Sequence, residues 1–488
     1  MIVEGSKLSI YFGESVEVGS TLASDALMGC VIDHGIRLAV LFRGLEGFGL
    51  NRRIHAERFP DVSTDLPLVL TAVDSHERIR DALDAIDEAM PRGLVTLEQA
   101  RLATGSDVDG AEFPDGPGKA AQVTIYCRAG EKVRGRLAYR EAVVTLRRHG
   151  ASGAIVLPGV DGIVAGRRGK ARLFAANRNT PMAIISIGAP ETLQRCLPRL
   201  RELFTEPTVT LERLAAVKHD GELLEAPPMV ARTADWDGDV RQAIQVFTRQ
   251  AAKVHGRALH AALTLRLREL GAAGATTILG DWGFSSDEPP HGDKVGTVAS
   301  HRPTYSVYID RPEKVAELWP VIDELTASHG VVTSLLVPGY RERAGDSMHG
   351  VLALPGDIAT LWRRQEQQER DLGSLPGEGG PERSEWPRAF LARAEQFARK
   401  RGRQEPIVRA TLADGESFFV YAIEPGPGES FLTLYPHPER YDDFVQGANG
   451  LSLPPRAVIV PCRSIMKLEL LTRPPRGTPS LVTLRQSP

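Results

Sequence analysis

The segment RGLEGFGLNRRIHAE, residues 43 to 57, combines closely spaced glycines with cations, a pattern typical of anion-binding loops. Gly44, Gly47 and Gly49 permit positive φ and close approach of the backbone, which leaves N–H groups free to hold an anion. The cations that could add charge-assisted contacts to a phosphate or carboxylate are Arg43, Arg52, Arg53 and His55. A glycine-rich turn with solvated arginines has the same composition, so this alternative stays open.

Two further segments repeat the pattern with different charges. PGVDGIVAGRRGKAR, residues 158 to 172, keeps Gly162 and adds cations, which makes it the best candidate for an anion or an acidic partner. Those cations are Arg167, Arg168, Lys170 and Arg172. LGDWGFSSDEPPHGDK, residues 279 to 294, keeps a Gly-Phe pair but adds Asp287 and Glu288, and is the poorest candidate. A solvated basic loop remains the alternative for the second segment.

These segments belong to a threefold internal repeat. Five landmarks recur at nearly constant spacing: Tyr11, Tyr126 and Phe247; Gly35, Gly150 and Gly271; Gly47, Gly162 and Gly283; Pro67, Pro181 and Pro303; Thr96, Thr210 and Thr333. The spacings are 114 to 115 residues and then 121 to 123, so all five stay in step.

Each repeat reads as strand, helix, strand, loop, strand, helix and strand, the order of the ferredoxin-like fold. LSIYF and PLVLTAV are strands, and Asp74 or Ser75 is positioned to cap the second helix. PLVLTAV is apolar on both faces, whereas two helices cover only one face of a sheet. We therefore expect the three sheets to pack around a pseudo-threefold axis, as a pseudo-trimer within one chain.

The stretch from KLSIYFGES to LVTLEQA, residues 7 to 103, resembles the PII-like superfamily, in the branch named domain of unknown function 190. The Gly47-Phe48-Gly49 loop base also resembles PII signal-transduction proteins. That resemblance implies clefts between copies that bind small effectors, often adenine nucleotides. It also implies that the loop of residues 47–66, with counterparts at 162–180 and 283–302, docks on partners.

The sequence departs from the PII pattern at two places. Leu50 follows the Gly-Phe-Gly motif where PII proteins usually have arginine and then glutamine. The second phosphate loop is reduced to MPRGLV, residues 90 to 95, with Arg92 as its only cation. ATP binding in the PII manner is therefore not implied by these residues.

Composition excludes several classes of protein. The net charge of −3 gives no whole-chain attraction to nucleic acid or to an anionic membrane. The sequence shows no apolar run long enough to cross a bilayer, no signal peptide and no paired cysteines with metal-site spacing, so we expect a cytoplasmic protein without metal or cofactor. No catalytic signature appears, and His34 and His149 precede helix-ending glycines, where they suit a helix C-terminus better than general-base work. We expect no enzyme.

The last third of the chain differs from the repeats. WPRAFLARAEQFARKRGR, residues 386 to 403, predicts an amphipathic helix, and the strands PIVRATLADGESFFVYAIE, SFLTLYP and RAVIVPCRSIMKLELL follow it. This layout is similar to small Sm-like or SH3-like barrels. Tyr435, His437 and Tyr441 are the residues suggestive of RNA binding, but an assembly or docking domain fits better. The expected domains are repeats at 1–105, 119–220 and 238–340, a linker at 341–386, and a helix plus small β domain at 387–475.

We interpret the chain as a non-catalytic PII-like regulator that binds a small anionic effector, a nucleotide being suspected, between repeats. A loop conformation would then report binding to a protein partner. The alternatives are a docking scaffold without a small ligand, for a membrane transporter or channel, and RNA binding through the C-terminal barrel.

Overall fold

The computed structural model divides the chain into two compact units, Met1–Gln365 and Glu366–Pro488, which are described separately. In the first unit it describes residues 2–49, 52–56, 65–114, 118–171, 177–224, 240–285, 289–292, 302–345 and 347–352. In the second unit it describes the strands between residues 407 and 471.

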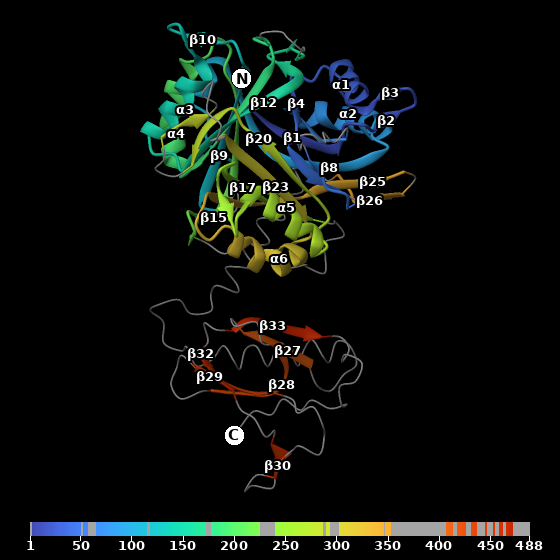
Figure 1. Cartoon of the computed structure of the whole chain (residues 1–488), viewed down its shortest axis with the longest axis vertical. Helices are drawn as coiled ribbons and strands as arrows, with labels where there is room; N and C mark the ends of the chain where they lie inside the picture. The colour runs from blue at the N-terminus through green and yellow to red at the C-terminus, as the bar shows by residue number, and fades with distance from the viewer. Residues whose placement is uncertain are drawn as a thin grey trace. The chain divides into compact units, whose positions relative to one another are not determined.

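Repeat 1 is a four-stranded antiparallel sheet with two helices (Figure 1). Its main elements are β1 (Ile2–Gly13), α1 (Ala23–Asp33), β4 (Leu38–Arg43), β7 (Pro67–Ser75), α2 (His76–Glu88) and β8 (Arg92–Thr104). The strands pair in the order β4-β7-β1-β8. Its minor strands are β2 (Glu17–Val18), β3 (Thr21–Leu22), β5 (Glu46–Phe48) and β6 (His55–Ala56).

Repeats 2 and 3 have the same element order and the same pairing. Repeat 2 contains β9 (Ala120–Arg128), α3 (Ala138–Arg148), β12 (Gly153–Val164), β14 (Pro181–Gly188), α4 (Pro190–Arg201) and β15 (Thr208–His219). Repeat 3 contains β17 (Arg241–Arg249), α5 (Leu259–Glu269), β20 (Ala275–Leu279), β23 (Pro303–Asp310), α6 (Pro312–Leu325) and β24 (Val331–Val337), with β21 (Trp282–Ser285) after β20.

Local sequence signals explain where the elements begin and end. Ser75 is the N-cap of α2, and its hydroxyl accepts the backbone N–H of Arg78 at 3.4 Å, as one of the two predicted caps. Pro190 and Pro312 occupy the first positions of α4 and α6, where the missing N–H costs nothing. At the end of α1, the Nδ1 of His34 lies 2.8 Å from the carbonyl oxygen of Cys30, one turn back.

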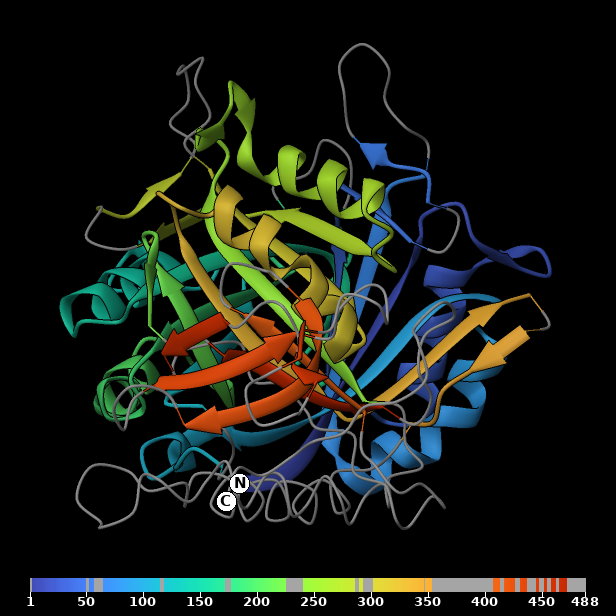
Figure 2. The same cartoon turned by 90° about the horizontal axis from the view of Figure 1, so that it is seen from below.

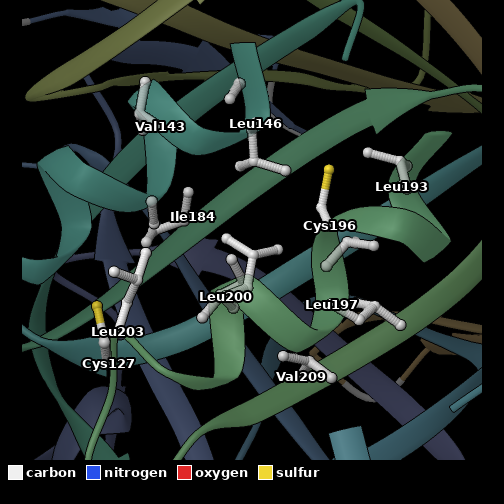
Figure 3. Packing of buried hydrophobic residues seen from close by; sticks show 14 of the residues in the cluster. Cys127, Val143, Leu146, Ile184, Leu193, Cys196, Leu197, Leu200, Leu203 and Val209 are labelled. Atoms are coloured by element: carbon white, nitrogen blue, oxygen red, sulfur yellow. The ribbon is translucent and has the colours of Figure 1, made fainter. Parts of the chain in front are cut away.

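Each pair of helices covers one face of its own sheet. In repeat 2, Val143 and Leu146 of α3 and Leu197 and Leu200 of α4 pack over the sheet (Figure 3). All of these side chains are buried, and Ile184 of β14 lies beneath them. The two pairs α1–α2 and α5–α6 enclose equivalent cores in repeats 1 and 3.

The opposite faces of the three sheets form one shared core. Its buried side chains come from every repeat and include Val40, Phe42, Tyr126, Ile185 and Phe247. The last strands of the repeats also pair with one another: β15 with β8, β24 with β15, and a strand after β24 with β8. Viewed from below, the three repeats surround a common centre (Figure 2). The predicted need to bury a second apolar face explains this arrangement.

The strand that completes this set is β25 (Gly339–Ala344), which pairs with residues Arg92 to Leu97 of β8 and forms a hairpin with β26 (Ser347–His349). The sequence predicts a linker that starts at residue 341. The first residues of that segment instead belong to the sheet, because the free edge of β8 supplies hydrogen-bonding partners for them.

The C-terminal unit holds a five-stranded antiparallel sheet in the order β32-β29-β28-β27-β33. Its strands are β27 (Ile407–Leu412), β28 (Ser417–Pro425), β29 (Phe431–Pro436), β32 (Val458–Pro461) and β33 (Ile465–Leu471), and a separate pair joins β30 (Val445–Gln446) to β31 (Ser452–Leu453). Tyr435 lies in β29. The predicted helix at 386–403, His437 and Tyr441 lie outside the described residues.

Candidate effector cleft

The glycine-rich segments form the seams between repeats. In repeat 1, β5 pairs with β20 of repeat 3, with Gly47 opposite Thr276. In repeat 2, the end of β12 pairs with β4 of repeat 1, with Gly162 opposite Val40. In repeat 3, β21 pairs with the start of β12, with Gly283 opposite Ile155. In each repeat, this segment thus pairs with the second strand of another repeat.

The spacing across these seams explains the glycines. A Cβ atom on Gly47 would lie 2.6 Å from the carbonyl oxygen of Ala275, and Cβ atoms on Gly162 and Gly283 would lie closer still to the facing carbonyls. Gly162 also has a φ of 152°. Two of the N–H groups near Gly47 are already bonded, because Gly44 donates to the Pro67 carbonyl and Leu45 to that of Thr277, both at 2.7 Å. The glycines here therefore allow the close backbone approach that strand pairing between repeats requires.

The residue after each seam glycine anchors one repeat in the core of the next. Phe48 is only 5% exposed and packs among residues of α5 and α6 in repeat 3. Ile163 enters the core of repeat 1, and Phe284 enters that of repeat 2. Ile163 therefore fills the same apolar role in repeat 2 as the aromatic rings of Phe48 and Phe284 do in the other repeats.

Most of the predicted anion-binding cations have structural partners. Arg43 binds Glu14 through two nitrogens, with the shorter contact at 3.0 Å, and the Nη2 of Arg52 donates to the Gly271 carbonyl of repeat 3 at 3.2 Å. Arg53 is exposed. In repeat 2 the contacts are Arg168 with Asp161 at 2.7 Å, Lys170 with Asp25 at 2.8 Å and Arg167 with Glu206 at 3.6 Å. The buried Asp161 also raises the pKa of Arg168 through a direct hydrogen bond.

A cavity of about 460 Å³ lies between repeats 1 and 3, within the size range of small-molecule sites. It brings together five of the predicted effector-binding residues: Gly47, Phe48, Gly49, His55 and Arg92. Its apolar surface includes Tyr11, Phe12, Val307 and Ile309. Repeat 3 also contributes lining residues that the sequence did not predict: Ala273, Gly274, Ala275 and Thr276. Glu342 of β25 and Gly345 in the turn after it complete the lining.

The charges around this cavity are mixed. The carboxylates of Glu17, Asp65 and Glu342 line it, and Arg92 is exposed at the end where β8 begins. His55 lies 3.8 Å from Asp65, measured from Nδ1 to Oδ2. The lining therefore offers hydrogen-bond acceptors along much of its length and one guanidinium group for an anion.

A second polar feature, which the sequence analysis missed, lies in the shared core. The Nζ of Lys7 is 2.6 Å from Glu98 and 2.7 Å from Glu212, and Gln122 donates to Glu212 at 2.8 Å. Burial alone would lower the pKa of Lys7, but Glu212 and Glu98 outweigh it and hold that pKa well above its ordinary value. Burial raises the pKa of Glu212, because it disfavours the charged form; the Lys7 ammonium opposes this shift and the Glu98 carboxylate adds to it. The only signal in the sequence was a lysine just before the apolar run LSIYF.

The chain matches the family model described as "Uncharacterized ACR", domain of unknown function 190, three times, over residues 5–102, 120–216 and 241–338. This chain belongs to that family. The three matches coincide with the three repeats and cover more than half of the chain, so the suspected resemblance is confirmed.

Relatives in two organisms are of the size of one repeat. The UPF0166 protein MJ1524 of Methanocaldococcus jannaschii is 38% identical over 87 residues, which is 17% of this chain and 79% of that protein. A UPF0166 protein of Aquifex aeolicus is 31% identical over 72 residues, which is 15% of this chain and 75% of that protein. A second protein from the same organism is 29% identical over 70 residues, 14% of this chain and 66% of that protein.

The described residues offer little for two other kinds of site. Among them, no three His, Cys, Asp or Glu side chains come together in a way that could hold a metal ion. None of the helices in the same residues is long and apolar enough to cross a membrane.

Proposed function

We propose that this protein is a non-catalytic, PII-like regulator that binds a small effector in the cleft between repeats 1 and 3. The observation that carries the proposal is the cavity of about 460 Å³, which is bounded by the base of the predicted effector loop. The residue at the start of β8, Arg92, stands where the second phosphate loop of PII proteins is reduced. An anionic group of the effector would lie against this guanidinium.

We also infer that each repeat is a ferredoxin-like PII unit, that the three form a pseudo-trimer, and that the C-terminal sheet is part of a small barrel. The strand order β4-β7-β1-β8 and its two counterparts support the first inference. The seams repeat at equivalent positions in all three repeats, which supports the second. The five strands of the C-terminal sheet support the third.

Signalling would use the loop of residues 47–66. Its first residues lie in β5 and contact repeat 3, while Gly49 and Asp65 near its two ends line the cavity. An effector in the cavity therefore touches both ends of the loop, and binding would change the loop conformations available to a protein partner, such as a transporter or channel.

Isothermal titration of the full-length protein with adenine nucleotides, cyclic nucleotides and simple anions tests the effector. We expect binding of at least one, and about tenfold weaker binding or worse for Arg92→Glu, since the substitution replaces an attraction with a repulsion. Arg257→Glu, an exposed arginine of repeat 3 outside the cavity lining, is the charge-matched control and should bind as the wild type does. If no compound binds the wild type, a docking scaffold without a ligand explains the loops better.

A further inference from the structure

The three clefts differ at one position of the first strand. Gly13, Arg128 and Arg249 are equivalent, because they pair with Pro67, Pro181 and Pro303 at the start of the third strand of each repeat. Gly13 lines the cavity between repeats 1 and 3. Repeats 2 and 3 therefore carry a long cationic side chain where repeat 1 has none.

The guanidinium group of Arg128 has a defined place. Its Nη2 donates a hydrogen bond of 2.8 Å to the carbonyl oxygen of Val164, at the end of β12. Val164 is the counterpart of Gly49, because the preceding residues Ile163 and Phe48 hold the same register in their seams. Gly49 also lines the cavity. Arg128 thus spans, in repeat 2, two positions that in repeat 1 face the open cavity.

In repeat 2, polar contacts also hold positions that correspond to lining residues of the cavity. Arg167 pairs with Glu206, and the Oε1 of Glu131 accepts the backbone N–H of Thr205 at 2.7 Å. In repeat 1, Arg92 is the counterpart of Glu206 and Val16 that of Glu131. These positions therefore carry polar contacts in repeat 2, and an exposed arginine and an apolar side chain in repeat 1.

The cavity beside repeat 1 keeps acceptors where Arg128 would donate. The carbonyl oxygen of Gly49 accepts the Arg52 N–H at 2.8 Å and has a second lone pair. Glu17, Asp65 and Glu342 surround the same cavity. A planar cation with several N–H donors suits such a lining, as the guanidinium of Arg128 shows in repeat 2.

We propose that this protein takes one effector per chain, in the cleft beside repeat 1, and that a guanidinium or amidine-like group of the effector donates to the Gly49 carbonyl in the place that Arg128 fills in repeat 2. Gly13 is the residue that determines this specificity, and Arg128 and Arg249 keep the other two clefts closed. The count of one effector rests on the proposed function. The preference for a planar N–H donor does not need it.

Guanidinium ion, well below denaturing concentrations, is the probe. Crystals of the wild-type protein soaked with it should show the ion at the Gly49 carbonyl and none at that of Val164. In Arg128→Gly, a second ion should occupy the vacated place at Val164. Absence of the ion from Gly49 in the wild type, or its presence at Val164 while Arg128 is intact, would overturn the proposal.

The reverse substitution gives an independent measurement. Gly13→Arg should weaken calorimetric binding of guanidinium by about tenfold or more, since the new side chain occupies the cavity. A Cβ at this position would lie 2.5 Å from the Oδ1 of Asp65, a side chain that can turn and pair with the new arginine. Gly29→Arg in α1, where a Cβ meets nothing within 4 Å, is the matched control and should bind as the wild type does. Unchanged binding in Gly13→Arg would refute the role of Gly13.

The outcomes separate this inference from the proposed function. If nucleotides or anions bind while guanidinium does not, the regulatory function stands and the donor preference is wrong. If the wild type binds three effector molecules, the function stands and the closure of two clefts is wrong. If guanidinium occupies Gly49 but no compound of the effector panel binds, the cleft chemistry stands and the proposed function falls.

Discussion

Phe48→Ala tests whether the seams hold the repeats together. Phe48 belongs to the sequence of repeat 1, but its ring is 5% exposed and lies in the core of repeat 3, against α5 and α6. Removing a buried phenylalanine side chain typically costs about 3–5 kcal/mol, from lost burial plus the cavity left behind. We expect a loss in this range, because the strands of the seam fix the backbone on both sides and limit collapse of the cavity.

Hydrogen exchange followed by mass spectrometry on the full-length protein is the assay, because it reports local stability without assuming a two-state transition. Protection should fall more in α5 and β20 of repeat 3 than in α1 of repeat 1. Leu22→Ala, at a side chain that is 41% exposed, is the control and should change protection little. The reasoning fails if Phe48→Ala costs less than about 1 kcal/mol, far below the usual range, or loosens repeat 1 alone.

Three further predictions concern the centre and the seam. Lys7→Met leaves the buried Glu98 and Glu212 without a cation, so urea denaturation at neutral pH should show a loss of about 3–5 kcal/mol, and a smaller loss in acid. The raised pKa of Glu212 contributes stability that is fully present below the pKa of the unfolded state and is lost as the pH rises through the pKa of the folded state. Glu212→Gln should therefore flatten the dependence of the free energy of unfolding on pH in that window. An unchanged pH dependence would contradict this. Gly47→Ala should lower the free energy of unfolding by about 1–3 kcal/mol, because the new Cβ clashes with the Ala275 carbonyl, so its effect is not limited to ligand binding. Equal stability of variant and wild type in thermal unfolding would contradict a structural role of Gly47 in the seam.

The sequence was sufficient for the features that local chemistry decides. The repeat follows from spacing, and Pro67 begins the strand predicted for PLVLTAV. The landmark prolines Pro181 and Pro303 begin the equivalent strands. Ser75 caps its helix because the cap needs only a side-chain oxygen near the first turn. Burial of the second sheet face follows from strands that are apolar on both sides.

The partners of the glycine segments could not be predicted in the same way. Gly47 faces a strand of another repeat, so its role depends on how the repeats dock. The sequence analysis expected free N–H groups around Gly44, whereas that N–H donates to Pro67. The cleft likewise includes Glu342 from the segment after repeat 3, which enters it because β25 pairs with β8.

The arrangement at the centre shows what fusion of the copies permits. Lys7, Gln122 and Ala243 are equivalent, because they face Glu98, Glu212 and Leu335 on the last strand of each repeat. Three identical subunits would place three lysines and three glutamates there, all buried and each needing partners. The fused chain keeps one lysine, two carboxylates and an amide, so that a single ammonium group joins repeats 1 and 2 while repeat 3 closes the centre with apolar side chains.

The same freedom acts at the clefts. A symmetric trimer must open or close all three together, because one residue type occupies all three positions. Here Gly13 lines the cavity beside repeat 1, while Arg128 donates an N–H of its guanidinium group to the matching carbonyl in repeat 2. Where an arginine of the chain supplies the N–H donor, that seam needs no bound ligand, because the donor is covalently attached. Under the proposed function, a chain with one open cleft would respond to an effector at a single seam, while the other seams stay paired without one.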